Sequence, residues 1–163
     1  MTTALLQHLG RRQQRGVALV EFALMVPVLL VLAVATTEIG RALYEYNTVA
    51  KAVRNAARYM SMQDPVDVNA RATARNLVVY GRPDADADGD VAPLAVNLSL
   101  ANIPDGNITW QTTGTNPTMS VVTVRATNYV FRPLIERMFG LELGGANGGI
   151  TFPDIRASMR GQL

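Results

Sequence analysis

The chain has 163 residues and a formal net charge of +2 at neutral pH. It contains no cysteine, which excludes disulfides, thiolate metal sites and cysteine nucleophiles. Its one histidine, His8, lies in a basic N-terminal segment, so a histidine-based triad or zinc site is not expected in the rest of the chain. Three arginines and no acidic residue precede Gly16, so the positive charge belongs to this segment and nucleic-acid binding is not indicated.

An apolar run begins at Val17 and reaches Thr37, with one carboxylate, Glu21, inside it. About 20 mostly apolar residues are enough to cross a bilayer as a helix, and we expect residues 17–38 to be transmembrane. The three arginines before the run have no counterpart after it, because Glu38 and Arg41 roughly cancel. The positive-inside rule therefore predicts a cytoplasmic N-terminus and a periplasmic C-terminal domain.

Phe22 and Pro27 both lie inside this run. Proline would kink or loosen a water-soluble helix, but it is tolerated in membrane helices, where neighbours satisfy the freed carbonyl. Three other interpretations of the run stay open. It could be a signal peptide cut after Ala35, since residues 33–35 read A-V-A, or an ordinary single-pass anchor, or a buried core helix.

The residues around Gly16 resemble a type IV prepilin processing site, in which a membrane aspartyl peptidase cuts after the glycine. The stretch G-VALVEFALMVPVLL, continued by EIGRALYEYNTVAKAVRNAARY, is similar to the N-terminus of TadE-like pseudopilins, minor components of tight-adherence (Flp-type) pili. The C-terminal stretches VTVRATNYVFRPLIERMFG and RASMR are also similar to that family. Val17 stands where many pilins have phenylalanine, and the GFTLIE form of type II secretion pseudopilins is absent, so the Tad group is favoured.

This resemblance implies a structural subunit with no catalytic role. Residues 1–16 would be a leader removed by a prepilin peptidase, and Val17 would be the first mature residue. The other partners would be pilins or pseudopilins and the pilus assembly platform of the bacterial inner membrane. From there the subunit could enter an extracellular pilus.

Glu21 has a physical role in this interpretation. Cleavage after Gly16 creates a positively charged amine on Val17, and a carboxylate one helical turn further along can neutralise it, in its own chain or in a neighbour. Paired charges in a medium of low dielectric offset the cost that each would bear alone. We therefore expect Glu21 to set the position of one subunit on the next.

The helical period continues beyond the membrane. Apolar residues recur at alternating spacings of four and three, which predicts a helix over residues 39–62 with one stripe packed on the protein's own sheet. The stripe consists of Ile39, Leu43, Tyr46, Ala50, Val53, Ala57 and Met60. A second helix is expected over residues 65–79, capped by Asp64 and ended by Gly81.

Residues 81–93 form an acidic loop. Asp84, Asp86, Asp88 and Asp90, with Gly89 between the last two, match the opening of a calcium-binding loop. The match then fails, because the twelfth position holds Ala95 where such a loop has glutamate. The alternatives are a calcium site and a solvated turn in which aspartate and glycine serve the local geometry.

Alternating apolar residues then predict a small antiparallel sheet over residues 94–160. Strands are expected at 94–100, 107–113, 119–130 and 150–159, with a short helix at 133–139, a glycine-rich hairpin loop at 144–149 and an edge or bulge at Pro153. The predicted fold is α+β and pilin-like: a long N-terminal helix, half in the membrane, packs with a second helix on about four strands, and residues 39–163 form the exported domain.

Two other functions remain open at this stage. A membrane-anchored periplasmic binding module would share the anchor and need no cut at Gly16. A secreted calcium-binding protein would need the signal-peptide cut after Ala35. The mature N-terminus discriminates among the three: Val17 supports the pseudopilin, Thr36 supports secretion, and Met1 or Thr2 supports a plain anchor.

Overall fold

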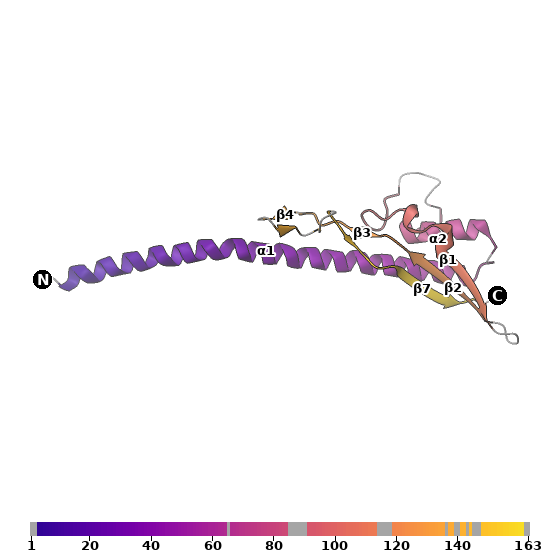
Figure 1. Ribbon diagram of the computed structural model, residues 1–163, viewed down its shortest axis with the longest axis horizontal. Helices are drawn as coiled ribbons and strands as arrows, with labels where there is room; N and C mark the ends of the chain where they lie inside the picture. Colours follow the sequence, from indigo (N-terminus) through magenta and orange to yellow (C-terminus); the bar gives the residue numbers. More distant parts are fainter. Residues whose placement is uncertain are drawn as a thin grey trace. The chain divides into compact units, whose positions relative to one another are not determined.

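The structure is a computed structural model that describes residues 3–64, 66–84, 91–113, 119–135, 137–138, 141–142, 144 and 148–161. The chain divides into two compact units, Met1–Ile39 and Gly40–Leu163. Helix α1 (Thr3–Met60) begins in the first unit and ends in the second (Figure 1). The predicted continuity of the helix through the apolar run into the folded domain is therefore confirmed.

The first unit consists of the N-terminal part of α1. Its large apolar side chains are exposed over the predicted span, as Leu19 and Leu24 illustrate with 70% of each exposed. The hydroxyls of Thr36 and Thr37 donate to the carbonyls of Leu32 and Ala33, so the helix satisfies these polar groups itself. Within the described residues, Gly16–Met60 is the one helix whose length and composition would let it cross a membrane. This long apolar helix is consistent with a membrane anchor.

The second unit packs a short helix and a small sheet on the C-terminal part of α1. Helix α2 (Val68–Val79) is followed by two 3-10 turns, η1 (Leu100–Asn102) and η2 (Asp105–Asn107). Strands β1 (Ile108–Thr113), β2 (Met119–Ala126) and β7 (Ile155–Arg160) form an antiparallel sheet in the order β1-β2-β7. Two short pairs complete the described strands: β3 (Val130–Phe131) pairs with β6 (Ile150–Thr151), and β4 (Arg137–Met138) pairs with β5 (Leu141–Glu142).

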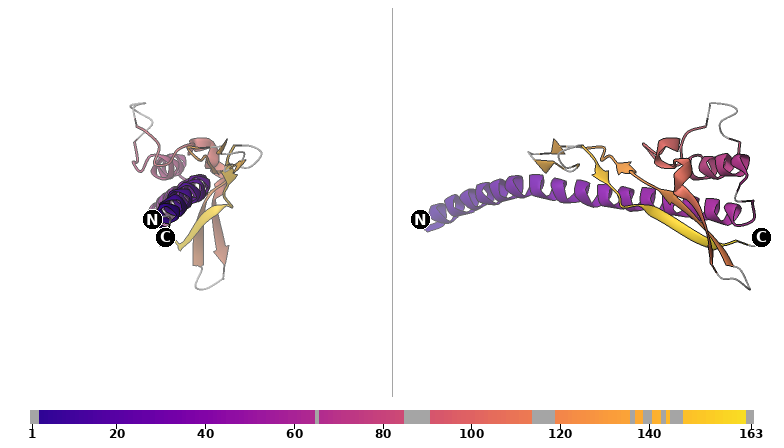
Figure 2. Two further views of the ribbon diagram at one scale, coloured as in Figure 1. Left: turned by 90° about the vertical axis from the view of Figure 1, so that its left-hand side faces the viewer. Right: turned by 45° about the vertical axis from the view of Figure 1, so that its right-hand side comes forward.

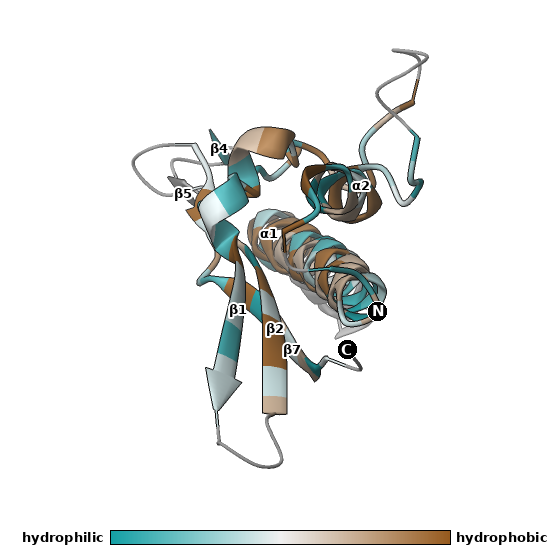
Figure 3. Ribbon diagram, turned by 90° about the vertical axis from the view of Figure 1, so that its right-hand side faces the viewer, coloured by the Kyte–Doolittle hydropathy of each residue, from teal (hydrophilic) through white to brown (hydrophobic). Residues whose placement is uncertain are grey.

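The core of this unit lies between α1, α2 and the sheet (Figures 2 and 3). On both helices it is built largely from alanine and valine, which let the backbones approach closely. Val53, Ala57 and Met60 of the predicted stripe are buried, whereas Ile39 and Leu43 are 61% and 58% exposed. Tyr46 and Ala50 are partly buried against the core, so the stripe packs on the domain from Tyr46 onward. The buried core residues that α1 contributes are Val49, Ala52, Val53, Ala56, Ala57 and Met60.

The second helix starts later than expected. Its cap is Asp67, whose carboxylate accepts from the amide of Asn69 at 2.8 Å, and not Asp64. Asp64 makes a local turn instead, accepting from the amide of Val66 at 2.9 Å. Both aspartates accept a hydrogen bond from the amide two residues further on. Asp67 directly precedes the first residue of the helix and is therefore its cap.

The strand expected at 94–100 is wrong. The amide of Leu98 donates to the carbonyl of Ala95, Asn97 adopts a positive φ of 64°, and the segment ends in η1. Turn hydrogen bonds and the left-handed conformation of Asn97 prevail over the alternation of apolar side chains. Of the alternating residues Leu94, Val96, Leu98 and Leu100, only Leu98 is buried, at 3% exposure. Within the described part of the chain, the main sheet consequently has three strands where about four were expected.

The strand expected at 119–130 divides into β2 and β3, because Asn128 adopts a φ of 55° and the amide of Thr127 bonds to Asn102. The strand expected at 150–159 divides into β6 and β7 around Pro153, which supports the expected irregularity there. The helix expected at 133–139 is wrong, since residues 133–135 are not helical and β4 follows. Of the loop at 144–149, residues 145–147 lie outside the described residues. The α+β class itself is confirmed.

Candidate functional site

Gly16 and Val17 lie within continuous helix. A methyl group added at Gly16 would meet no described atom of this chain within 4 Å, so packing inside the subunit does not require glycine there. Glycine in a helix interior costs about 1 kcal/mol relative to alanine. The residue therefore weakens the helix without a packing reason of its own, which fits a position that another protein recognises.

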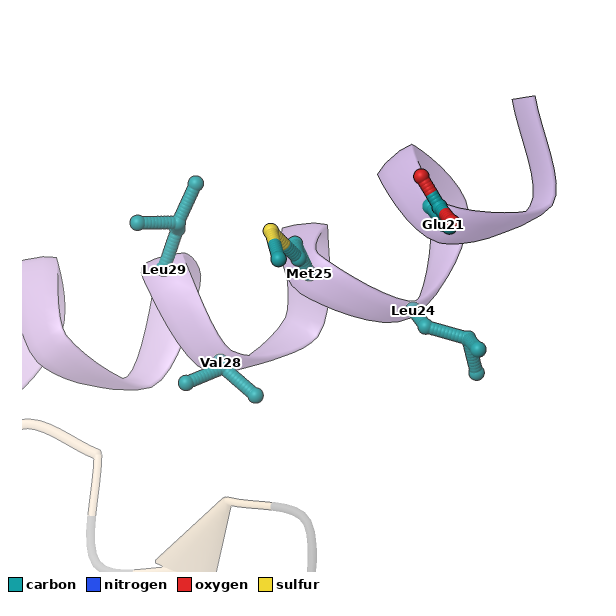
Figure 4. A pocket seen from close by; sticks show the side chains of 5 residues that line it. All are labelled: Glu21, Leu24, Met25, Val28 and Leu29. Carbon is teal, nitrogen blue, oxygen red and sulfur yellow. The ribbon is translucent and has the colours of Figure 1, made fainter. Parts of the chain in front are cut away.

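Glu21 lies on an apolar face of α1. A shallow open groove of about 460 Å³ is lined by Glu21, Leu24, Met25, Val28 and Leu29 (Figure 4). Glu21, Met25 and Leu29 follow one another at intervals of four residues, so they form one row along the helix. Glu21 supplies the one polar side chain of this lining. Its carboxylate has no hydrogen-bond or ion-pair partner among the residues that the structure describes.

An apolar groove with one unpartnered carboxylate can hold the apolar side of another helix that brings a positive charge. It has no nucleophile, and no acid–base pair accompanies the carboxylate among its lining residues. The same helix contains Phe22, Pro27 and Thr37, as expected, and the chain is helical at all three positions.

A cluster that the sequence did not reveal joins α1 to the strand region. Glu45 is buried at 7% exposure, although it lies off the predicted apolar stripe. Its Oε1 accepts from Nη1 of Arg41 at 2.7 Å, and its Oε2 accepts from the hydroxyl of Tyr129 at 2.6 Å. The guanidinium of Arg41 also lies 4.4 Å from the ring centroid of Phe131 and donates to the carbonyl of Arg132. We call Arg41, Glu45, Tyr129 and Phe131 the latch cluster.

In the latch cluster Glu45, Tyr129 and Phe131 are buried, and Arg41 is partly buried. Burial, then the hydrogen bond to Glu45 and its charge, raise the pKa of the Tyr129 hydroxyl above its ordinary range, while Arg41 acts in the opposite direction. The ring of Phe152 stacks on Tyr129, with centroids 5.8 Å apart. The spacing of four residues between Arg41 and Glu45 is a sequence signal for an ion pair on one helix. No local pattern predicts the contact of Glu45 with Tyr129, because the two residues lie far apart in the sequence.

A second hollow of about 500 Å³ lies between α1 and the edge strand β7. It is lined by Tyr46, Asn47, Ala50 and Arg54 and by residues 154–159. Its one carboxylate, Asp154, lies 3.7 Å from Arg125, in an exposed ion pair. No nucleophile with an adjacent base is present in this lining, so it offers a surface and not a catalytic arrangement.

The acidic loop is described only in part. Asp84 lies in an exposed turn, and Asp86, Asp88 and Asp90 lie outside the described residues. The calcium hypothesis therefore stays a prediction.

These features define a class: a protein with one long apolar N-terminal helix that carries a small α+β domain and exposes a carboxylate on its apolar face. Residues 16–58 match the family model of TadE-like proteins, and this segment is a TadE-like domain. That family is associated with the Tad pilus and is not a family of enzymes. The match begins at Gly16 and ends at residue 58, within α1, so the C-terminal resemblance lies outside it. Comparison with curated proteins and with solved structures finds no match.

Proposed function

We propose that the chain is a pseudopilin, a minor structural subunit of a Tad (Flp-type) pilus. Residues 17–38 anchor it in the bacterial inner membrane, with the N-terminus cytoplasmic and the domain from residue 39 periplasmic. A prepilin peptidase removes residues 1–16 by cutting after Gly16. The subunit is then available to the assembly platform and to other pilins, and it performs no catalysis.

One observation carries the proposal: Glu21 lies without a described partner in an otherwise apolar groove, inside a TadE-like domain that starts at Gly16. An isolated carboxylate in the hydrocarbon layer is expensive, by a few kcal/mol on insertion scales. After cleavage, the new amine of Val17 lies four residues away, about one helical turn. When this amine pairs with the carboxylate of Glu21, in the same subunit or in a neighbouring one, the pairing offsets the cost of both charges.

The mature N-terminus tests the proposal. Intact-mass spectrometry of the full chain extracted from its native membrane should give a protein that begins at Val17. A chain beginning at Thr36 would support a secreted protein with a cleaved signal peptide, and an uncut chain would support a plain anchored binding module. Either result would contradict the pseudopilin.

Two glycines of α1 provide a matched pair of variants. A side chain added at Gly16 or at Gly40 meets no described atom of the subunit within 4 Å, so each substitution should leave the fold intact. We expect Gly16→Leu to accumulate at the mass of the uncut chain and Gly40→Leu to be processed like the wild type. Equal processing of both variants would show that the peptidase does not read Gly16.

A further inference from the structure

Strand β7 is an edge of the main sheet and has a neighbouring strand on one side only. Within the described chain the sheet runs β1-β2-β7, and β7 pairs with β2 over its whole length (Figure 3). The amide of Gly161 donates to the carbonyl of Ser120 at 2.8 Å, in register with this ladder. Hydrogen-bonded and non-hydrogen-bonded residues alternate in an antiparallel pair. The N–H and C=O groups of every second residue back from Gly161 therefore point to β2, whereas those of Arg156 and Ser158 point to the free edge.

The hollow between α1 and β7 borders this free edge. It holds about 500 Å³, with Tyr46, Ala50 and Arg54 of α1 on one side and residues 154–159 on the other. Six residues of a strand extend over about 20 Å, at about 3.4 Å per residue. When an extended peptide adds to a sheet, the main-chain groups of the edge hold it and the neighbouring surface receives its side chains. The hollow offers both along the length of about six residues.

This edge carries positive charge that has no partner in the described chain. Arg54 and Arg156 both line the hollow and are exposed, and no hydrogen bond or ion pair joins either of them to another described residue. Arg156 lies directly across the ladder from Arg125, whose charge is already paired with Asp154 at 3.7 Å. Like charges opposite each other destabilise a sheet, and opposite charges stabilise it. A carboxylate beside Arg156 would therefore be favourable.

We propose that the free edge of β7 binds an extended acidic segment of another protein as a fourth, antiparallel strand of the main sheet. Main-chain hydrogen bonds join the segment to Arg156 and Ser158. Successive side chains of a strand point to opposite faces. Carboxylates at alternate positions of the segment therefore lie beside Arg156, and the exposed Arg54 adds attraction. The side chains between them lie on the face of the sheet that packs on α1.

The charge of the edge selects its partner. Charged side chains on an edge strand discourage pairing with a neutral or like-charged strand, whereas carboxylates turn the same side chains into an attraction. Strand β1, at the opposite edge, carries no charged side chain and does not line the hollow. The β7 edge lies wholly within the unit Gly40–Leu163, so this proposal does not depend on a cut after Gly16.

Peptide binding to the full chain in a zwitterionic detergent tests the proposal. The probe is a fluorescent eight-residue peptide of alternating aspartate and valine, followed by fluorescence anisotropy. In one control peptide lysine replaces aspartate. In a second the aspartate amides, which face β7 in the proposed register, are N-methylated, so the charge stays and the ladder bonds are lost. We expect only the first peptide to bind with a dissociation constant below about 1 mM. No binding below that value, or equal binding of all three peptides, would overturn the proposal.

Substitutions of the arginines separate a local contact from general charge attraction. We expect Arg54→Gln and Arg156→Gln each to weaken binding about threefold, as the loss of one opposite-charge pair does. The double variant should bind about tenfold more weakly, which corresponds to about 1.4 kcal/mol. Arg82→Gln removes the same charge from an exposed position after α2 and should leave the affinity unchanged. An equal loss in Arg82→Gln would assign the binding to net charge and overturn the proposal.

Hydrogen exchange, followed for each amide by nuclear magnetic resonance, locates the contact. The peptide should slow exchange severalfold at Arg156 and Ser158 and leave Ala157 and Met159, which already face β2, unchanged. Binding without this alternation would contradict strand addition. Protection of Arg156 and Ser158 that rises with protein concentration in the absence of peptide would assign the edge to a second copy of the chain, and it would likewise overturn the proposal.

Discussion

Two carboxylates on α1 lie in opposite surroundings. Glu45 is buried and bonded to Arg41 and Tyr129, so its charge is used inside the fold. Glu21 lies in an apolar groove without a partner among the described residues. Removing one member of a buried charged pair is strongly destabilising, because the other is left uncompensated. We therefore expect mutations of Glu45 to affect the stability of the domain and mutations of Glu21 to affect assembly.

Replacing Glu21 should separate processing from incorporation. In Glu21→Ala and in the uncharged, equally long Glu21→Gln, we expect normal cleavage but at least about a tenfold smaller fraction of the subunit in isolated pilus complexes, since tenfold corresponds to about 1.4 kcal/mol. Immunoblots of the membrane and pilus fractions measure this. Met25→Ala, in the same row of the groove, is the control for lost apolar contact. Normal incorporation of both Glu21 variants would refute the charge-pairing role.

Tyr129 predicts a dependence of stability on alkaline pH. Its pKa is raised in the folded state, so between the ordinary tyrosine value near 10 and the folded value the unfolded chain binds fewer protons than the native one. The contribution of Tyr129 to the free energy of unfolding should therefore stay constant with pH below pH 10. Above pH 10 it should fall, by at most about 1.4 kcal/mol per pH unit. In the full chain in detergent, Tyr129→Phe should show a shallower loss of melting temperature above pH 10. Tyr44→Phe, at a 72% exposed tyrosine, should keep the wild-type slope.

At the scale of elements, the contact between α1 and α2 depends on small side chains. Ala56 and Ala57 of α1 and Ala70 and Ala74 of α2 are buried at 2% exposure or less. Alanine at such positions lets two helices approach without cavities, and it leaves no room for a larger side chain.

Overpacking this contact should destabilise the domain. Ala74→Leu places extra methyl groups at a position with no exposure, and we expect a loss of about 1–3 kcal/mol. Ala72→Leu, on the exposed side of α2, should change stability by less than about 0.5 kcal/mol. Thermal unfolding followed by circular dichroism checks both. Equal losses in the two variants would mean that α2 does not pack on α1 through Ala74.

The two helices α1 and α2, and the place of Glu21 on an apolar helix, could be predicted because their signals are local. A period of three to four residues and a glycine five residues before a glutamate can be read from adjacent positions. The failures arise where distant residues decide. Asn102 holds the carbonyls of Thr127 and Asn128 through its side chain, and this contact breaks the strand expected there. The latch cluster likewise depends on Tyr129 meeting Glu45 across most of the domain, which no spacing reveals.

At the scale of the whole molecule, one helix belongs to two units and presents different surfaces in them. Its first part exposes apolar side chains throughout, and its last part contributes a buried face to the core. The fully buried hydrophobic residues of the described chain begin at Val49, so they all belong to the unit Gly40–Leu163. Among the described residues, no member of this hydrophobic core comes from the first 39 residues.

We therefore expect residues 40–163, expressed alone, to fold as an independent domain. Circular dichroism should show one cooperative thermal transition, with a melting temperature within roughly 5 °C of that of the full chain in detergent, since about 1 kcal/mol shifts a domain of this size by 4–8 °C or less. Ala74→Leu should lower both melting temperatures by the same amount, because the same core is strained in both. A fragment without a cooperative transition, or one that Ala74→Leu does not affect, would show that the domain needs the N-terminal part of α1 to fold.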